Sequence, residues 1–298
     1  MQKIHLDTDL GGDIDDLCAL AMLLKWDDVD ITGITTVAEE DGRRAGYVKY
    51  VLKLAGRDDI PVKAGANCLD QCRYQKLEYP PDDENWSEKI APAPNPLDEA
   101  LDLLKHSIDT GAIIVAIGPF TNLYLLDKKY PGILSKARLY LMGGYIYPVR
   151  QGLPQWGNDM DWNIQFDITS AKYVLEHSNP TLIPLTVTVE TALKRESLEK
   201  LSRAGDMGQL LVRQVELHEK LYKNEEKYGL INFQHDPLAV AIALGWRDEV
   251  EIQQIPLEFE QKDGWLHETI APTGKLIPVV TKIDGGEFSD YWVRVVTR

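Results

Sequence analysis

A regular alternation of short apolar runs with longer amphipathic segments is the feature that most constrains the fold of this chain. The apolar runs have the composition of buried strands, and the segments between them have the spacing of helices with one apolar face. Strands are expected at residues 3–6, 31–37, 60–64, 113–117, 139–142 and 181–187, and helices at 17–25, 43–54, 95–106, 122–130 and 170–176. This order is typical of parallel βαβ units, so we expect an α/β fold with an open, mainly parallel sheet flanked by helices.

From residue 190 onward the pattern predicts a helical and mixed C-terminal elaboration. Helices are expected at 196–203, 209–223 and 237–243, and β-like segments at 250–257, 277–280 and 291–296. No linker or internal repeat separates this part from the rest, so we expect a single domain over residues 1–298. Residues 66–96 and 145–161 interrupt the alternation and are expected to form long loops over the same face.

Composition narrows the class of partner. The chain has 298 residues, 44% of them hydrophobic, and a net charge of −15, which disfavours nucleic acid or an anionic membrane as a partner. No run is long and apolar enough to span a bilayer, and the first residues do not resemble a signal peptide, so we expect a cytoplasmic protein. Cys18, Cys68 and Cys72 lack a zinc-site pattern and are expected to be reduced thiols.

Acidic residues crowd the segment after the first expected strand. The five carboxylates there are those of Asp7, Asp9, Asp13, Asp15 and Asp16, and an Ala/Leu-rich helix follows them. Helix-dipole or capping interactions would account for one or two of these acids, but five would repel one another unless protons or a cation intervened. An all-oxygen ligand set suits Ca²⁺ or Mg²⁺. The segment therefore predicts a metal site at the edge of the sheet where α/β proteins bind ligands.

Three further motifs occur downstream of this acidic segment. They are GPFTNL at residues 118–123, MGG at 142–144 and HDPLA at 235–239. With the acidic segment, and in this order, they resemble the inosine/uridine-type nucleoside hydrolase family over roughly residues 3–245. The resemblance implies a nucleoside hydrolase-like open α/β fold, one bound Ca²⁺, and hydrolysis of a ribonucleoside to ribose and free base by metal-activated water.

The resemblance also implies roles for individual residues. Metal ligands would be Asp9, Asp16, Asp236 and the backbone carbonyl of Ile117, and Asp9 would also accept the proton of the attacking water. Sugar hydroxyls would be bound by Asp15, Asp161 and Asn163. A homo-oligomer, either a dimer or a tetramer, is expected, with a small nucleoside as the substrate.

The chemistry of such a reaction agrees with these residue types. Cleavage of an N-glycosidic bond builds positive charge on the sugar carbon, which carboxylates stabilise. The departing base needs a proton donor, and His235, next to Asp236, is the candidate acid. Alternatively, His235 is a helix-start histidine with a purely structural partner.

The chain departs from the family pattern at three places. The acidic loop is two residues longer and contains the extra Asp13, the usual Gly-Asn is replaced by Glu39-Glu40, and Asp161 stands where glutamate is more usual. Glu40 is therefore a candidate substrate contact, and a modified sugar is compatible with these changes. The aromatic candidates for stacking on the base, each of which could equally pack in the core, are Trp86, Trp156, Trp162, Tyr222 and Tyr228, and Trp162 is the one we assign to the pocket.

Two other functions are compatible with part of the pattern. A haloacid dehalogenase-type phosphohydrolase also begins with a strand and an Asp-x-Asp loop, but its downstream residues are not recognisable here. A calcium-dependent nucleoside or sugar binder without catalysis would need no base such as Asp9. Turnover of para-nitrophenyl phosphate, or nucleoside binding without ribose release, would distinguish these functions from hydrolysis.

Overall fold

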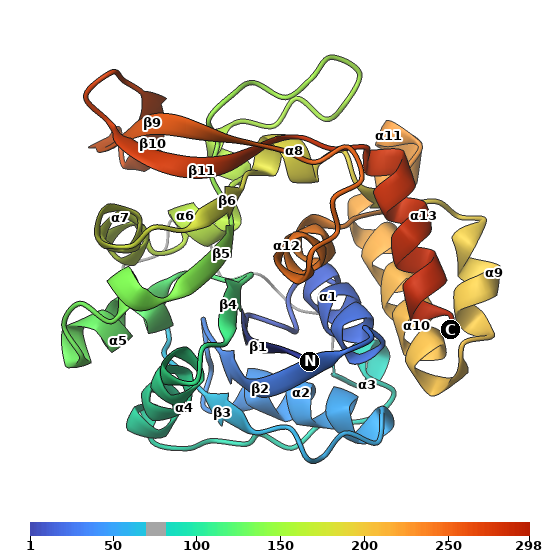
Figure 1. Ribbon diagram of the computed structural model, residues 1–298. Coiled ribbons are helices and arrows are strands. Elements are labelled where there is room, and N and C mark those ends of the chain that lie inside the picture. Colours follow the sequence, from blue (N-terminus) through green and yellow to red (C-terminus); the bar gives the residue numbers. More distant parts are fainter. Residues whose placement is uncertain (70–81) are drawn as a thin grey trace.

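The computed structural model describes residues 1–69 and 82–298, and within them a sheet of nine strands crosses the molecule (Figure 1). Its order is β10-β9-β11-β6-β5-β4-β1-β2-β3. The strands are β1 (Gln2–Thr8), β2 (Val29–Thr36), β3 (Val62–Ala64), β4 (Ile113–Ala116), β5 (Arg138–Met142), β6 (Thr181–Ile183), β9 (Glu251–Lys262), β10 (Trp265–Ile270) and β11 (Lys275–Lys282). Seven of them, from β3 to β11, run parallel, and β9 and β10 add an antiparallel edge. The predicted mainly parallel α/β fold is confirmed.

Helices cover both faces of the sheet. The α-helices are α1 (Asp15–Leu24), α2 (Arg43–Leu54), α3 (Asp82–Asn85), α4 (Leu97–Asp109), α5 (Thr121–Lys129), α6 (Trp162–Gln165), α7 (Ile168–His177), α8 (Leu185–Thr188), α9 (Ser197–Ser202), α10 (Gly205–Tyr222), α11 (Asn224–Tyr228), α12 (His235–Leu244) and α13 (Gly285–Val296). One apolar core joins the sheet to α1, α2, α12 and α13, and a second joins it to α4, α5 and α7, which lie on the left in Figure 1. No helix in the described part of the chain has the length and apolar character needed to cross a bilayer.

Short elements complete the fold. Two 3₁₀ turns, η1 (Leu134–Lys136) and η2 (Asn158–Met160), precede β5 and α6, and the small strands β7 (Ala192–Leu193) and β8 (Asn232–Phe233) pair with each other.

The strand order reverses between β1 and β4. Strands β2 and β3 follow β1 outward on one side, whereas β4, β5 and β6 follow one another on the other side. The loops after β1 and β4 must therefore diverge, and such a switch point leaves a crevice at the carboxyl ends of the strands where ligands bind. Asp9 follows β1 and Ile117 follows β4, so the fold places both at this crevice.

Most of the predicted elements are confirmed within a few residues, but the strand expected at 181–187 is wrong in its second half. Strand β6 ends at Ile183, and Leu185 begins α8. Pro184 between them has no N–H to donate to a neighbouring strand, and its fixed φ suits the residue that leads into a helix. β-branched composition alone did not reveal this boundary.

The β-like segment expected at 291–296 is also wrong, because it is the second half of α13. The helix begins after Asp284, whose side chain accepts a hydrogen bond from the backbone N–H of Glu287. Phe288 and Trp292, four residues apart, are both fully buried, so the apolar residues follow a helical rather than an alternating period. Strand β10, which the sequence did not indicate, occupies the sheet edge instead.

Truncation of Trp292 to alanine is expected to destabilise the protein by about 3–5 kcal/mol, because it removes a large core side chain. The indole packs without exposure and donates a hydrogen bond to the carbonyl of Cys18, 3.0 Å away, which ties α13 to α1. Urea unfolding measures the effect. The exposed Asp290 on the same helix provides the control Asp290→Ala, and equal stability of the two variants would contradict this role for Trp292.

Candidate functional site

A cavity of about 380 Å³, here called the acidic cavity, opens where β1, β4 and β5 end. Its lining combines carboxylates with aromatic and aliphatic side chains. The predicted site residues among its lining are Asp9, Asp15, Asp16, Ile117, Trp162, Asn163, His235 and Asp236. Residues far apart in the sequence thus meet at the predicted edge of the sheet.

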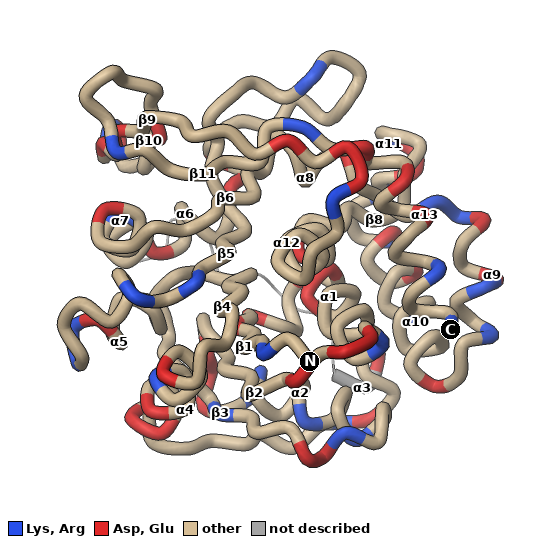
Figure 2. The backbone as a smooth tube through the Cα atoms, in the orientation of Figure 1, with Lys and Arg blue, Asp and Glu red and all other residues tan. Residues whose placement is uncertain are grey.

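Three carboxylates form the tightest group in the cavity. Asp15 and Asp16 begin α1, Asp236 begins α12, and one oxygen of each lies within 4.8 Å of the others. The backbone N–H of Asp236 also hydrogen-bonds to the Asp15 carboxylate. Figure 2 shows the acidic residues at the start of α1 lying beside α12. The hydrogen bond from the first turn of α12 accounts for Asp15 alone, and neither N-cap side chain accepts a hydrogen bond, so capping does not account for all three acids.

Asp9 lies at the same cavity but outside this group of three. Its backbone carbonyl accepts a hydrogen bond from Arg44, whose guanidinium also donates to the carbonyl of Ala38 at 2.8 Å. Gly118 passes so close that a Cβ there would lie 2.7 Å from Asp9 Oδ1, so this position needs glycine. The predicted ligand set contains Asp9, whereas the geometric group contains Asp15, which sequence reasoning assigned to the sugar.

The electrostatics of the group favour a cation. Burial, followed by repulsion from neighbouring carboxylates, raises the pKa values of Asp15, Asp16 and Asp236 well above their usual range. Burial also raises the pKa of Asp9, although the Arg44 charge opposes the rise. Carboxylate oxygens are hard ligands, and a divalent cation would supply the positive charge that these buried acids lack. The donor set therefore fits Ca²⁺.

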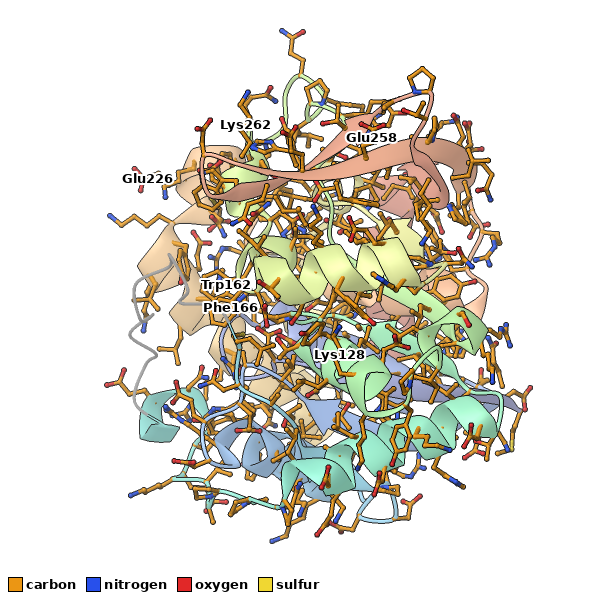
Figure 3. All side chains as sticks on the ribbon, turned by 90° about the vertical axis from the view of Figure 1, so that its left-hand side faces the viewer. Lys128, Trp162, Phe166, Glu226, Glu258 and Lys262 are labelled. Atoms are coloured by element: carbon orange, nitrogen blue, oxygen red, sulfur yellow. The ribbon has the colours of Figure 1, made fainter. Side chains whose placement is uncertain are left out.

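The short helix α6 contributes Trp162 and Asn163, the two cavity residues that the sequence assigned to the substrate. Asn163 donates hydrogen bonds to the carbonyl of Ile117 at 2.9 Å and to that of Met142 at 3.2 Å, which joins the ends of β4 and β5. Trp162 hydrogen-bonds to the Asp9 carboxylate, and its ring centroid lies 4.7 Å from that of Phe166. Figure 3 labels Trp162 and Phe166 one above the other. Both α6 residues thus contact groups that the sequence assigned to the metal.

One face of α10 forms the outer wall. Gln214, Leu217, His218, Leu221 and Tyr222 recur at helical spacing and line the cavity, as does Trp156 from the 145–161 segment. The prediction that residues 145–161 lie over this face is confirmed. Of the aromatic candidates, Trp156, Trp162 and Tyr222 line the cavity, whereas Trp86 is buried and stacks on Tyr47 at 4.5 Å.

His235 joins the carboxylates to this outer wall. Its Nδ1 lies 2.7 Å from the Thr188 hydroxyl, and burial lowers its pKa to about 4. His218, which sequence reasoning missed, lies 3.0 Å from Asp13, and the pair joins the extended loop to α10. The signal that could have identified His218 was a histidine within the apolar face of the helix expected at 209–223.

Two predicted substrate contacts, Glu40 and Asp161, are not among the described residues that line the acidic cavity. Glu40 is half exposed and forms an ion pair with Arg43, with 3.5 Å between the charged groups. Asp161 is buried and accepts a 2.6 Å hydrogen bond from the backbone N–H of Gly144. Asp7 lies under the site, where its carboxylate accepts hydrogen bonds from Thr35 and Asn122.

The family model for the inosine-uridine preferring nucleoside hydrolase matches residues 4–290 of the chain. The chain belongs to this family. The predicted enzyme class, an N-glycosyl hydrolase, is thereby confirmed.

Curated relatives of this nucleoside hydrolase carry related names. The chain is 26% identical over 249 residues to the pyrimidine-specific ribonucleoside hydrolase RihA of Citrobacter koseri, with 80% of this chain and 78% of the relative covered. It is 25% identical over 259 residues to uridine nucleosidase 1 of Arabidopsis thaliana, with 80% and 72% covered.

Solved structures support the same fold. A plant nucleoside hydrolase, the PpNRh1 enzyme, superimposes with a TM-score of 0.81 at 20% identity, with 99% of both chains covered. A purine-preferring ribonucleoside hydrolase from Gardnerella vaginalis gives a TM-score of 0.80 at 21% identity, with 99% of this chain and 98% of the other covered.

The Glu39-Glu40 departure from the family pattern has a local structural explanation. Glu39 accepts hydrogen bonds from the backbone N–H groups of Glu40, Arg44 and Ala45 and from the Thr36 hydroxyl. Its carboxylate therefore satisfies free N–H groups at the start of α2 and lies near the positive end of the helix dipole. In this nucleoside hydrolase the first of the two glutamates thus orders the helix next to Asp9.

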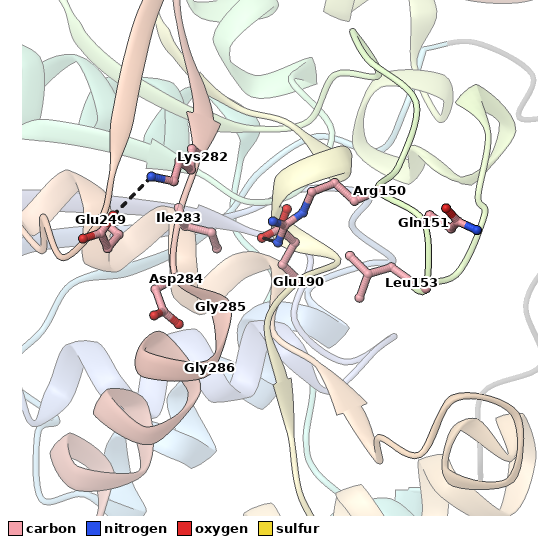
Figure 4. A pocket seen from close by; sticks show the side chains of 11 residues that line it. Arg150, Gln151, Leu153, Glu190, Glu249, Lys282, Ile283, Asp284, Gly285 and Gly286 are labelled. Atoms are coloured by element: carbon pink, nitrogen blue, oxygen red, sulfur yellow. Dashed lines mark hydrogen bonds and ion pairs between the residues drawn. The ribbon is translucent and has the colours of Figure 1, made fainter.

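A larger hollow of about 670 Å³ lies on a different part of this nucleoside hydrolase, beside the start of α13 (Figure 4). Its two basic residues are each paired with an acid, Arg150 with Glu190 and Lys282 with Glu249 at 3.2 Å. It shares no described lining residue with the acidic cavity and brings together no comparable group of carboxylates. The acidic cavity is therefore the candidate active site.

Proposed function

We propose that this protein hydrolyses the N-glycosidic bond of a ribonucleoside to ribose and free base, with Ca²⁺ bound in the acidic cavity. The observation that carries the proposal is the buried group of Asp15, Asp16 and Asp236 beside Asp9, under an aromatic and aliphatic wall. Family membership supports the reaction class, and the all-carboxylate donor set supports calcium.

We assign the calcium ligands to Asp9, Asp16, Asp236 and the carbonyl of Ile117. Calcium, when bound, offsets the repulsion among the acids, orients sugar hydroxyls and makes a water molecule more acidic. Asp15 borders the same group and is proposed to accept a hydrogen bond from a sugar hydroxyl.

Asp9 is the proposed general base. It lies at the cavity and takes a proton from the attacking water, a task favoured by a carboxylate whose pKa is raised by burial. Positive charge that develops on the sugar carbon is stabilised by the surrounding carboxylates. Asn163 holds the sugar through its amide, and Trp162 keeps Asp9 oriented by its hydrogen bond.

His235 is proposed to assist departure of the base. Its pKa of about 4 leaves it neutral near pH 7, and a neutral imidazole still donates one N–H hydrogen bond. It lines the cavity between the carboxylates and Trp156, whose ring is 5.9 Å away.

Replacement of His235 by alanine is expected to lower kcat for nucleosides by roughly 10²- to 10³-fold, the range for loss of one hydrogen-bond donor to charge that develops in the transition state. The loss should be much smaller for 4-nitrophenyl riboside, whose leaving group departs without a proton. The exposed His106 provides the control variant His106→Ala. Equal losses for both substrates would contradict the assignment.

The function is tested by reducing-sugar release from a panel of purine, pyrimidine and modified nucleosides in the presence of calcium. Release from at least one ribonucleoside supports the proposal, and the panel ranks the bases and sugars. Nucleoside binding by calorimetry without sugar release would instead indicate a non-catalytic binder. Turnover of para-nitrophenyl phosphate would favour the phosphohydrolase.

A cytoplasmic location and a homo-oligomeric state, either dimer or tetramer, complete the proposal. Light scattering on the purified protein tests the oligomeric state, and cell fractionation tests the location.

A further inference from the structure

Two buried carboxyl groups lie behind the sugar side of the acidic cavity. Asp161 precedes α6 and accepts a 2.6 Å hydrogen bond from the N–H of Gly144. Glu268, on β10, accepts a 3.1 Å hydrogen bond from the N–H of Tyr145, the residue that follows Gly144. The remaining oxygens, Asp161 Oδ1 and Glu268 Oε1, are both buried and have no hydrogen-bond partner, although the backbone N–H of Ile164 also acts on the Asp161 carboxylate and lowers its pKa. Two adjacent backbone donors thus hold two acids whose other oxygens are unsatisfied.

Two buried carboxylates in this arrangement cannot both be ionised without a large cost. A buried oxygen without a partner costs free energy, and two like charges at close range repel in a medium of low dielectric constant. One proton between the two free oxygens removes both costs, because the protonated acid donates to the ionised one. After burial, the charge of Asp161 is the next cause that raises the pKa of Glu268, as expected for two neighbouring carboxyl groups.

Strand β10, which carries Glu268, is attached to α6 by a second contact. The Gln165 amide donates to the carbonyl of Leu266 at 2.8 Å and accepts from its N–H at 2.9 Å. Leu266 and Glu268 are two residues apart on β10, so they share one side of this edge strand. The edge strand therefore contacts both ends of the segment that carries Trp162 and Asn163.

We propose that Asp161 and Glu268 share one proton, and that this pair makes Glu268 a positioning residue for the substrate-binding turn at residues 161–163. Glu268 does not line the acidic cavity and acts through Asp161. The effect on the sugar rests on the proposed function, but the shared proton does not.

Burial, followed by the charge of Asp161, raises the pKa of Glu268 to about 8, and burial raises that of Asp161 to about 7. The pair titrates as a unit. Other titratable residues on the strands and helices packed against the pair are Glu251, Glu258, Glu260, Lys262, Asp159, Lys172, Tyr173, Glu176, His177 and His267. The charges of these residues do not contribute to the pKa shift of either Asp161 or Glu268.

The shared proton makes the stability of the fold decrease as the pH rises. The native state holds this proton more tightly than the unfolded chain does, so the stabilisation is complete below the ordinary carboxyl range of about pH 4. It is lost as the pH rises through 7 and 8. In Glu268→Gln the side chain cannot ionise, and its amide can donate to Asp161. This variant should therefore lose less stability between pH 7 and 8 than the wild type.

The experiment compares thermal unfolding from pH 5 to 9 for the wild type, Glu268→Gln and Glu260→Gln, with calcium at one saturating concentration. Glu260, exposed on the neighbouring strand, makes the same charge change without burial. We expect a shallower loss of Tm with pH only in Glu268→Gln. The infrared difference spectrum of the wild type minus Glu268→Gln at pH 6 should also show the band of one protonated carboxyl group.

Kinetics test the positioning role separately. Glu268→Ala is expected to raise KM for the nucleoside by roughly 10- to 100-fold, the range for loss of a group that supports a contact residue. Glu268→Gln should restore a value near that of the wild type.

The outcomes are distinct. A pH profile and carboxyl band unchanged in Glu268→Gln would overturn the shared proton, even if Glu268→Ala fails to fold. An altered profile with KM unchanged in a folded Glu268→Ala would overturn the positioning role. Failure of the wild type to release sugar would contradict only the proposed function.

Discussion

Replacement of Asp9 by asparagine is expected to lower kcat for ribonucleoside hydrolysis by roughly 10²- to 10⁴-fold, because the variant cannot accept the proton of the attacking water. The substitution keeps the shape of the side chain and removes one charge from a buried group of acids, so the thermal stability of the calcium-free protein should not fall. Sugar release under saturating nucleoside and calcium measures the effect.

Asp248→Asn is the matched control, because Asp248 is exposed and does not line the acidic cavity. It should retain the wild-type rate. An Asp9→Asn variant that is folded, binds nucleoside and turns over at the wild-type rate would show that another group accepts the proton.

Removal of calcium is expected to abolish sugar release, and its return should restore it. Without the cation, the buried acids retain protons or repel one another, and neither state orients the sugar as the proposal requires. Calcium at about 100 times its Kd should also stabilise the fold by about 2.7 kcal/mol. Thermal unfolding with and without calcium measures this stabilisation.

Asp236→Asn separates specific binding from a general salt effect. It removes one carboxylate of the central group, so a calcium concentration that stabilises the wild type should no longer do so. The control Asp290→Asn changes an exposed acid and should keep the full response. Undiminished turnover after exhaustive chelation would contradict the calcium assignment.

The parallel core of the fold could be predicted because its strands and helices have distinct periods. The runs that became β1 and β4 are apolar and bounded by loop residues, and the crowded acids at residues 7–16 have few structural explanations. Sequence reasoning failed where a local preference was overridden. The β-branched residues after Trp292 favour a strand in isolation, but the cap at Asp284 and the burial of Phe288 select a helix.

The candidate site was predictable where several motifs converge. It was less predictable where the role of a side chain depends on which neighbouring residue it binds. Asp161 is adjacent in sequence to the cavity residue Trp162, but its side chain accepts a hydrogen bond from Gly144 in the loop after β5, and Glu40 pairs with Arg43. Those partners come from packing between elements, which sequence spacing does not encode. The contact between Asp13 and His218 was hidden for the same reason. The loop expected at residues 66–96 lies partly outside the described residues, since 70–81 are not described.

The most direct test of the central claim is product analysis by mass spectrometry after incubation of the calcium-loaded protein with a ribonucleoside in ¹⁸O-labelled water. Hydrolysis at the sugar carbon predicts free base without label and ribose with one labelled oxygen, with no requirement for phosphate. Intact nucleoside across the whole panel, or a sugar phosphate formed only when phosphate is added, would contradict the account.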